Sequence, residues 1–232
     1  MRVAWFPKTT DLGGNPYWSR LQKELQALGI EFETSHESYW MRRRWLLEHR
    51  GRVQVLHFHF IQPQYIGAGD RASPLRLAKF SIDLLLARLL GYRIVWTMHD
   101  LMPTWPKEPH WVEVLARYVI AWLAHDVLVH CEEARRLARR HFGRCHDIRV
   151  LPLPGYADAH PNTISRGEAR ARLHIPEERY VVGFIGGIRP NKGLEDLIAA
   201  FQNAKVANAT LLIAGRPWPP QRRTAVAAAP GR

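Results

Sequence analysis

Short apolar runs alternate along this chain with segments in which apolar residues recur at every third or fourth position. A short apolar run closed by glycine or polar residues is typical of a buried strand, whereas the wider spacing is typical of a helix. The pattern predicts strands at 3–6, 30–32, 53–60, 93–98, 126–131, 148–151, 181–185 and 209–215. It predicts helices at 17–28, 73–91, 111–124, 132–142, 165–173 and 194–201.

Strands and helices alternate without an internal repeat, so their order predicts a doubly wound, Rossmann-like α/β fold. The stretch 154–166 is rich in proline, alanine and polar residues, and it predicts a linker between a first domain at 1–153 and a second at 167–216. The second domain has few predicted elements, and we expect it to be incomplete. The tail at 217–232 has no periodic apolar face, and we expect it to be disordered.

The composition is that of a globular protein, with 47% hydrophobic and 23% charged residues. Cys131 and Cys145 are the two cysteines, so no disulfide framework is predicted and a reducing cytoplasm fits. The N-terminus lacks a signal-peptide pattern, and no apolar run is long enough to cross a bilayer. We therefore expect a cytoplasmic location.

The formal net charge of +12 favours anionic partners: nucleic acid, anionic lipid or phosphorylated substrates. The arginines are spread over several helices without a recognised nucleic-acid motif, so we expect no nucleic-acid partner. The segment 39–47, YWMRRRWLL, suits either the headgroup layer of an anionic membrane or a surface helix with buried tryptophan and solvated arginine. The helix at 73–91 is apolar around most of its circumference, which favours a core helix over membrane docking.

The turn after the strand at 181–185 combines glycines with cations. Gly186 and Gly187 end the strand, and Arg189 and Lys192 follow before the next helix begins. Backbone N–H groups and the helix dipole favour an anion there, and the two cations can add charge-assisted hydrogen bonds. The pattern predicts a site for a phosphate-bearing ligand, with a solvated basic turn as the alternative. Arg216 follows the next strand and is a further candidate for a phosphate contact.

Three other places carry candidate chemistry. The glycine pair at 13–14 lets a ligand approach the backbone after the first strand. His57 and His59 share one side of a strand, and because no third ligand is nearby we consider a strand-end histidine facing a cleft, or a packed histidine, rather than a metal site. His99 and Asp100 follow another strand, where parallel sheets bind ligands; the histidine suits hydrogen bonds to a ligand, or the pair caps the following turn.

Two of these stretches carry a family resemblance. The sequence GGIRPNKG at 186–193 resembles the start of the nucleotide-binding domain of GT-B glycosyltransferases, especially glycosyltransferase family 4. The sequence WTMHDLMP at 96–103 resembles a second signature of bacterial family 4 enzymes, including those that build exopolysaccharides. The resemblance extends over 1–216 and implies a GT-B fold with an acceptor-side domain first. The E-x7-E segment that binds ribose and sugar in the family does not follow Gly215, so we expect a truncated second domain.

The resemblance implies roles for particular residues. In the family the arginine and lysine of the first signature hold the donor diphosphate, which implies that role for Arg189 and Lys192. A Gly-Gly loop faces the donor phosphates and the transferred sugar, which implies a donor-binding role for Gly13 and Gly14. The histidine of the second signature lines the active site beside the sugar, which implies a catalytic role for His99.

The expected function is therefore transfer of a sugar from a nucleotide-diphosphate sugar to a lipid-linked or polysaccharide acceptor. The expected location is cytoplasmic, at the inner face of the plasma membrane, with an anionic membrane surface as a further partner. No Asp-x-Asp motif is evident, so we expect neither a metal nor another cofactor. The alternative is a non-catalytic remnant that binds acceptor glycan or membrane lipid.

Overall fold

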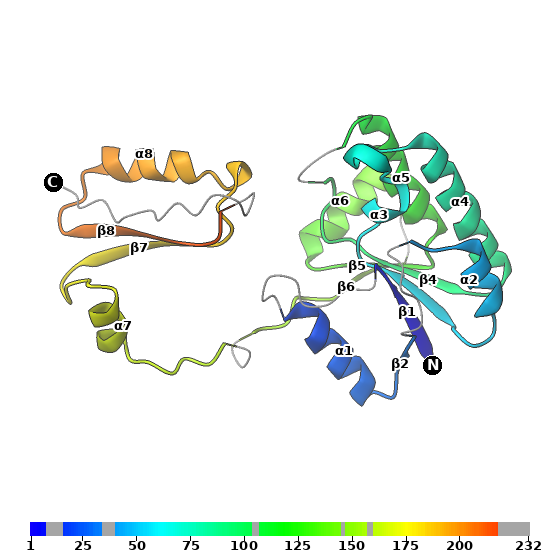
Figure 1. Ribbon diagram of the computed structural model, residues 1–232, viewed down its shortest axis with the longest axis horizontal. Helices are drawn as coiled ribbons and strands as arrows, with labels where there is room; N and C mark the ends of the chain where they lie inside the picture. The colour runs from blue at the N-terminus through cyan, green and yellow to red at the C-terminus, as the bar shows by residue number, and fades with distance from the viewer. Residues whose placement is uncertain (8–15, 34–39, 104–106, 145–146, 157–159, 218–232) are drawn as a thin grey trace. The chain divides into compact units, whose positions relative to one another are not determined.

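The computed structural model describes residues 1–7, 16–33, 40–103, 107–144, 147–156 and 160–217 of the 232-residue chain (Figure 1). The chain divides into two compact units, a first unit at Met1–Ala159 and a second unit at His160–Arg232. The linker bounds of 154–166 stay a prediction. Of the predicted tail, 218–232 lies outside the described residues, whereas Pro217 pairs with Ile188 in a short parallel bridge.

A parallel sheet forms the centre of the first unit. The described strands are β1 (Arg2–Phe6), β2 (Glu31–Phe32), β3 (Val55–Phe58), β4 (Arg93–Thr97), β5 (Asp126–Val129) and β6 (Ile148–Val150). Their order across the sheet is β2-β1-β3-β4-β5-β6, and every pair is parallel. The chain passes from β1 outward to β2 and then returns beyond β1 to β3. In doubly wound sheets, ligands bind beyond the carboxyl ends of the strands at such a reversal.

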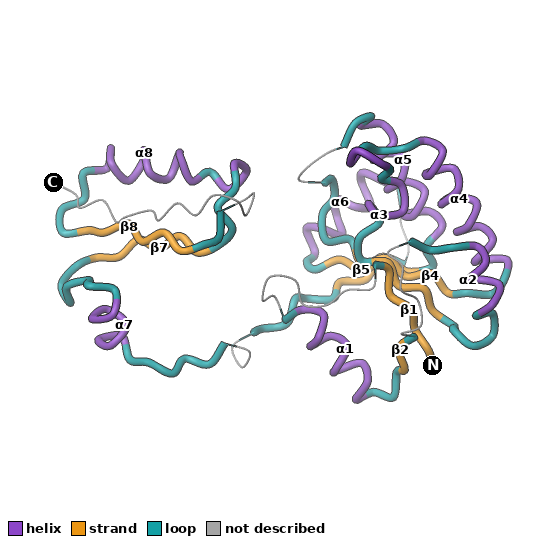
Figure 2. Tube along the Cα trace, in the orientation of Figure 1, coloured by secondary structure: helices purple, strands orange, loops and turns teal. Residues whose placement is uncertain are grey.

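Helices cover both faces of this sheet (Figures 1 and 2). They are α1 (Tyr17–Ala27), α2 (Arg43–Glu48), α3 (Gln62–Tyr65), the short 3₁₀ helix η2 (Ala68–Asp70), α4 (Pro74–Leu89), α5 (His110–Leu123) and α6 (Glu132–Phe142). Helix α1 lies on one face, and α2, α4, α5 and α6 lie on the other. Right-handed crossovers explain this division, because only the β1-to-β2 connection runs toward the β2 edge. The predicted doubly wound α/β class is confirmed.

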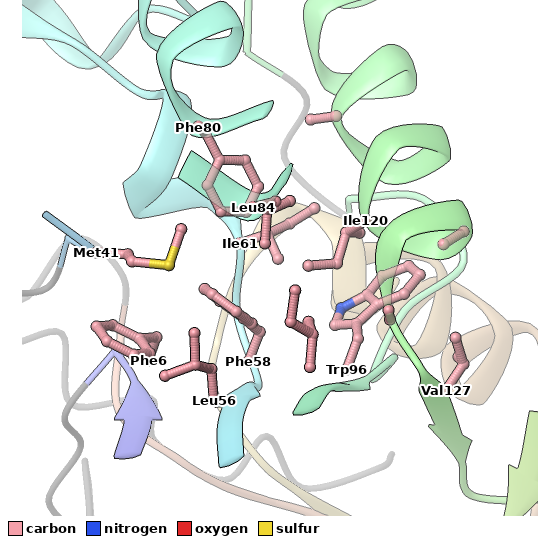
Figure 3. Packing of buried hydrophobic residues seen from close by; sticks show 14 of the residues in the cluster. Phe6, Met41, Leu56, Phe58, Ile61, Phe80, Leu84, Trp96, Ile120 and Val127 are labelled. Atoms are coloured by element: carbon pink, nitrogen blue, oxygen red, sulfur yellow. The ribbon is translucent and has the colours of Figure 1, made fainter. Parts of the chain in front are cut away.

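The main core lies between the sheet and the four helices on its second face (Figure 3). Phe58 and Trp96 from the strands meet Phe80 and Leu84 from α4 and Ile120 from α5, and all five are buried. Each such side chain contributes about 1.5–3 kcal/mol through removal from water. A second, smaller cluster on the α1 face contains the buried aromatic residues Trp5, Tyr17 and Trp18. The α1 face therefore places aromatic rings next to the sheet edge where the functional candidates lie.

The helix predicted at 73–91 packs in the core as expected, but its outer side is exposed. Helix α4 begins after Ser73, whose hydroxyl caps it by accepting a hydrogen bond from the Arg76 N–H at 3.3 Å. The helix buries one side in the core, but Leu75 and Leu89 on the opposite side are 81% and 84% exposed. A helix that is apolar nearly all round is normally buried throughout, so this exposed side requires an explanation.

The described part of the segment 39–47, residues 40–47, contains one tryptophan that packs against the core and one that lies on the surface. Helix α2 begins at Arg43, and Trp45 packs against the main core while its ring stacks on His49 at 4.3 Å. Trp40 lies on the surface with the Arg76 guanidinium 5.5 Å from its ring centre. One tryptophan is thus structural and the other is available at the surface.

In its described residues, the second unit contains two parallel strands, two α-helices and one short 3₁₀ helix. Its elements are α7 (Arg166–Arg172), β7 (Tyr180–Ile185), the 3₁₀ helix η3 (Pro190–Lys192), α8 (Leu194–Ala204) and β8 (Ala209–Ala214). Strands β7 and β8 pair in parallel over their full length. Ser165 and Glu168 form a capping box at the start of α7, with bonds of 2.7 and 3.2 Å. Across the described residues of both units, no helix has the length and apolar character needed to cross a membrane.

Candidate functional site

Four histidines lie at the carboxyl ends of three neighbouring strands in the first unit. His57 is in β3 and His59 follows that strand, while His99 follows β4 and His130 follows β5. Parallel strands end at one edge of a sheet, so the rings meet there. Ring centres are 4.1 Å apart for His57 and His59, 5.6 Å for His59 and His99, and 5.1 Å for His99 and His130. We call these four residues the histidine row.

A backbone carbonyl fixes the order of hydrogen bonds along the row. The Leu151 carbonyl can only accept, and it lies 2.9 Å from His130 Nδ1, so that nitrogen carries a proton. In the neutral ring, His130 Nε2 then accepts from His99 Nδ1 at 3.2 Å. His99 Nε2 is left with a lone pair, toward which His59 Nδ1 donates over 3.4 Å. The row therefore holds His99 as the tautomer with its proton on Nδ1.

Burial keeps the inner part of the row uncharged at pH 7. It lowers the pKa of His57 to about 3, with the neighbouring His99 adding to the effect. It lowers the pKa of His99 to about 4, with His130 as the second cause, and it holds the pKa of His59 well below its usual range. His57 Nε2 lies 2.8 Å from the Thr97 hydroxyl, so its polar nitrogen is satisfied inside the protein.

Aromatic side chains surround the row. From the start of α1, Trp18 places its ring 4.3 Å from His59, and Tyr17 places its ring 5.4 Å from His99, both edge to face. Phe60 stacks on His99 at 4.9 Å. Burial raises the pKa of Tyr17 to about 12, so its hydroxyl stays protonated at neutral pH. Apolar rings with a few directional polar groups are the usual composition of a ligand site.

The structure brings three sequence-predicted residues together. His59, His99 and Asp100 line one recess of about 10 Å³, with Asp100 exposed. The buried Arg117 of α5 holds the segment after β4 in place, because its Nε donates to the Leu101 carbonyl at 3.2 Å. The recess has room for about one water molecule, so a ligand would lie over it rather than inside it. Gly13 and Gly14 lie outside the described residues.

The second unit contains the predicted strand, glycine turn and helix. Strand β7 ends at Ile185, and Gly186 follows with a φ of +154°, a value that side-chain-bearing residues rarely adopt. Arg189 precedes η3, Lys192 ends it, and both side chains are exposed. Helix α8 already carries Glu195 and Asp196 in its first turn. Any anion is therefore better placed on the turn than on the α8 N-terminus.

Gly215 lies where the carboxyl ends of β7 and β8 approach each other. The Ile188 N–H donates to the Arg216 carbonyl at 3.0 Å, and the Gly186 N–H donates to the Ala214 carbonyl at 3.0 Å. Between these bonds the backbones approach so closely that a Cβ on Gly215 would lie 1.7 Å from the Gly186 carbonyl oxygen. The backbone of Arg216, predicted from sequence as a phosphate contact, is thereby held beside the turn that carries Arg189.

The pairing of His57 with His59 does not extend to a metal centre. Among the described residues, no three His, Cys, Asp or Glu side chains are grouped so that they could hold a metal ion. The His57 ring instead bonds to Thr97, and the His99 ring bonds to its histidine neighbours.

The sequence did not identify His130, Tyr17 or Trp18 as site residues. His130 ends a predicted strand just as His59 and His99 do, so a search for polar residues at successive strand ends would have found it. Tyr17 and Trp18 open the first helix after the first strand, which is where a doubly wound fold brings side chains to the carboxyl edge. No local pattern marks either ring as facing histidine rather than the core.

Comparisons with known proteins support the fold. No protein-family model matches the sequence, and no curated protein matches it. Among solved structures, Anabaena Alr3699/HepE in complex with UDP matches with a TM-score of 0.53 and 15% identity over 92% of this chain and 61% of that chain. The same protein in complex with UDP and glucose matches with a TM-score of 0.52 and 14% identity, over 94% of this chain and 61% of that chain. In complex with UDP-glucose it matches with a TM-score of 0.52 and 14% identity, over 92% of this chain and 60% of that chain.

At this level of identity the likeness establishes architecture. The chain has a GT-B-like α/β fold, in which a Rossmann-like unit is followed by the strands and helices of a second unit of the same type. It spans about three-fifths of the length of these neighbours.

Proposed function

We propose that this chain is a glycosyltransferase that takes a sugar from a nucleoside-diphosphate sugar, and that UDP is the nucleotide. The observation that carries the proposal is the glycine turn at the carboxyl end of β7, with Arg189 and Lys192 on it and Arg216 held beside it. Solved structures with the same fold hold UDP or UDP-glucose. Resemblance to family 4 enzymes that build exopolysaccharides favours a polysaccharide or lipid-linked glycan as acceptor.

The two cationic side chains suit the chemistry of the departing group. In the transfer, the bond between the anomeric carbon and the diphosphate oxygen breaks, and a bond to an acceptor hydroxyl oxygen forms. The acceptor loses its proton, and negative charge develops on the nucleoside diphosphate. Arg189 and Lys192 would stabilise that charge, which is the kind of interaction that lowers barriers most. We propose that no metal ion is needed.

The histidine row would act on the sugar and the acceptor. We propose that a sugar or acceptor hydroxyl donates to His99 Nε2 in place of the long 3.4 Å bond from His59 Nδ1, while His59 and Asp100 line the same edge. Its low pKa keeps His99 neutral at pH 7, so the ring can accept a hydrogen bond without first losing a proton. The surrounding aromatic rings would exclude water from this contact.

We also propose that the protein works on the cytoplasmic side of a membrane, attached to its surface. The alternative function is that of a non-catalytic protein that binds acceptor glycan or lipid through the first unit. The two functions differ in one respect: only a transferase requires the cations of the second unit.

Calorimetric titration with UDP, GDP and UDP-glucose tests the proposal. We expect UDP to bind, and we expect Lys192→Ala and Arg189→Ala each to weaken binding roughly 10- to 100-fold, since a hydrogen bond to a charged group contributes about 1.5–3 kcal/mol. Arg172→Ala removes an exposed cation from α7 of the same unit and is the matched control. Absence of nucleotide binding by the wild type, or equal loss in the control, would refute the transferase and leave the alternative function.

A further inference from the structure

The outward sides of α4 and α5 both carry exposed apolar side chains. Helices α4 and α5 pack side by side on the same face of the sheet. On their outward sides both expose large apolar side chains. We call these residues the outer apolar surface: Leu75, Ile82, Leu85 and Leu89 of α4, and Trp111, Leu115 and Trp122 of α5.

The spacing of these residues places them on one side of each helix. Leu75, Ile82 and Leu89 are seven positions apart, which is two helical turns, and Leu85 lies within the same stripe. On α5, Trp111 and Trp122 are both 55% exposed and flank Leu115 along one side. Single exposed apolar residues are ordinary, but two adjacent stripes on neighbouring helices mark an interaction surface.

The carboxylate side chains of both helices are buried. Asp83 is the only carboxylate in α4 and Glu113 is the only one in α5, and both are buried. Arg43 binds Asp83 at 2.9 Å, and Glu113 accepts from the Tyr65 hydroxyl at 3.3 Å. The exposed side of the two helices therefore offers apolar groups and cations, without a carboxylate of its own.

A basic groove runs along the α2 side of α4. Its volume is about 510 Å³, and its lining includes Arg42, Arg43, Arg44, Arg76 and Lys79, with Trp40 beside them. Arg43 is used by the buried Asp83, and Arg44 pairs with Glu48. Lys79 lies four positions after Leu75 and three before Ile82, so the groove borders the outer apolar surface directly.

We propose that the outer apolar surface and the basic groove together form a docking surface for an anionic lipid bilayer. Leucine and tryptophan side chains would enter the boundary between headgroups and acyl chains, and the groove would hold lipid phosphates. Charge complementarity favours a bilayer over a protein partner, because the surface combines apolar stripes with cations, and the one α4 carboxylate that lines the groove, Asp83, is buried and paired with Arg43. The proposal deepens the proposed membrane location and is independent of sugar transfer.

Vesicle co-sedimentation tests the docking surface. The probes are vesicles of phosphatidylglycerol and phosphatidylcholine in equal parts, and vesicles of phosphatidylcholine alone, at low and high salt. We expect the wild-type chain to bind the anionic vesicles more tightly, with high salt removing most of that preference. Leu75→Asn/Leu89→Asn should weaken binding to the anionic vesicles roughly tenfold or more. Arg42→Gln/Lys79→Gln should remove the preference for anionic lipid.

Matched controls separate this surface from general stickiness. Leu28→Asn replaces an equally exposed leucine at the end of α1, on the other face of the sheet, and should bind like the wild type. Arg166→Gln/Arg172→Gln removes two cations from α7 and should also bind like the wild type. Circular dichroism checks that every variant is folded.

Three results would overturn the proposal. The first is unchanged vesicle binding in both surface variants, and the second is equal loss in the controls. The third is that the wild type self-associates, whereas Leu75→Asn/Leu89→Asn is a monomer that binds vesicles as tightly as the wild type. That result would show that a second copy of the chain covers the surface. UDP titration of the same variants separates this test from the proposed function, since the surface substitutions should leave nucleotide affinity unchanged.

Discussion

His130 should control the tautomer of His99. Its ring lies between two groups that fix its own proton: Nδ1 donates to the Leu151 carbonyl at 2.9 Å, and Nε2 accepts from His99 Nδ1 at 3.2 Å. Leu151 is anchored next to β5, because its N–H donates to the Val129 carbonyl at 2.7 Å. His130 is a positioning residue, which acts on a sugar or acceptor only through His99.

Two substitutions at this position separate ring shape from hydrogen bonding. His130→Phe keeps the ring and removes the acceptor, so His99 loses the bond that holds its proton on Nδ1. A hydrogen bond of this kind contributes about 0.5–1.5 kcal/mol, which corresponds to a roughly 2- to 12-fold change in the tautomer ratio. His130→Gln places an amide oxygen close to the position of Nε2, and it should largely restore the tautomer. Because His130 is only half-buried, we expect both variants to fold.

Nitrogen-15 NMR of histidine-labelled protein measures this ratio, because protonated and unprotonated ring nitrogens have well-separated shifts. The wild type should show His99 with a protonated Nδ1, and the shift should move toward the average of both tautomers in His130→Phe. If transfer activity is established, its rate constant should fall by a similar factor and recover in His130→Gln. An identical His99 spectrum in wild type and His130→Phe would refute the reasoning, whatever the activity.

Other substitutions test the packing around both sites. Gly215→Ala places a methyl group against the Gly186 carbonyl, and we expect it to lower the free energy of unfolding by about 1–3 kcal/mol. It should also weaken UDP binding, measured by calorimetry. Gly183→Ala, where the added group meets open space, should bind UDP normally. Arg144 is buried and donates to the carbonyls of Ala121, Ala124 and His125. Arg144→Met should therefore lower the free energy of unfolding, measured in urea, by roughly 2–4 kcal/mol. Arg140→Met, at an exposed position, should change it little. Because the pKa of His57 is lowered to about 3, the unfolded chain binds more protons than the folded chain below pH 6.5. The free energy of unfolding should therefore fall as the pH drops from 6.5 toward 3, by up to about 1.4 kcal/mol per pH unit for this residue. His57→Gln should make this decline less steep when urea unfolding is measured as a function of pH. A steeper decline in His57→Gln would contradict this assignment.

The sequence predicted most of the elements because their periodicity is local. The glycines after 181–185 and the helical spacing after Leu194 place a strand, a turn and a helix correctly, since each depends on neighbours in the chain. His59, His99 and Asp100 were predicted at strand ends, and parallel pairing brings them to one edge. The roles of these residues stay proposals.

Contacts across the sheet could not be read in the same way. The link from His130 to His99 depends on β4 lying next to β5, and the contact of Gly215 with Gly186 depends on β7 lying next to β8. Helix α4 shows a different limit. Its leucines cover most of its circumference, so the pattern cannot tell which side enters the core and which side stays exposed.

The position of the proposed docking surface allows its contribution to the proposed sugar transfer to be measured separately. The outer apolar surface belongs to helices on one face of the sheet, whereas the histidine row lies against Trp18 and Tyr17 on the α1 face. Docking through α4 and α5 would therefore leave the row uncovered, and it would raise the local concentration of a lipid-linked acceptor without altering the chemistry. We expect Leu75→Asn/Leu89→Asn to raise the apparent KM for an acceptor carried in anionic vesicles, because fewer molecules reach the surface. The kcat on a water-soluble acceptor should stay at the wild-type value, since neither leucine contacts the row. A fall in kcat on the soluble acceptor would show that the two leucines act on the fold or the site rather than on membrane attachment.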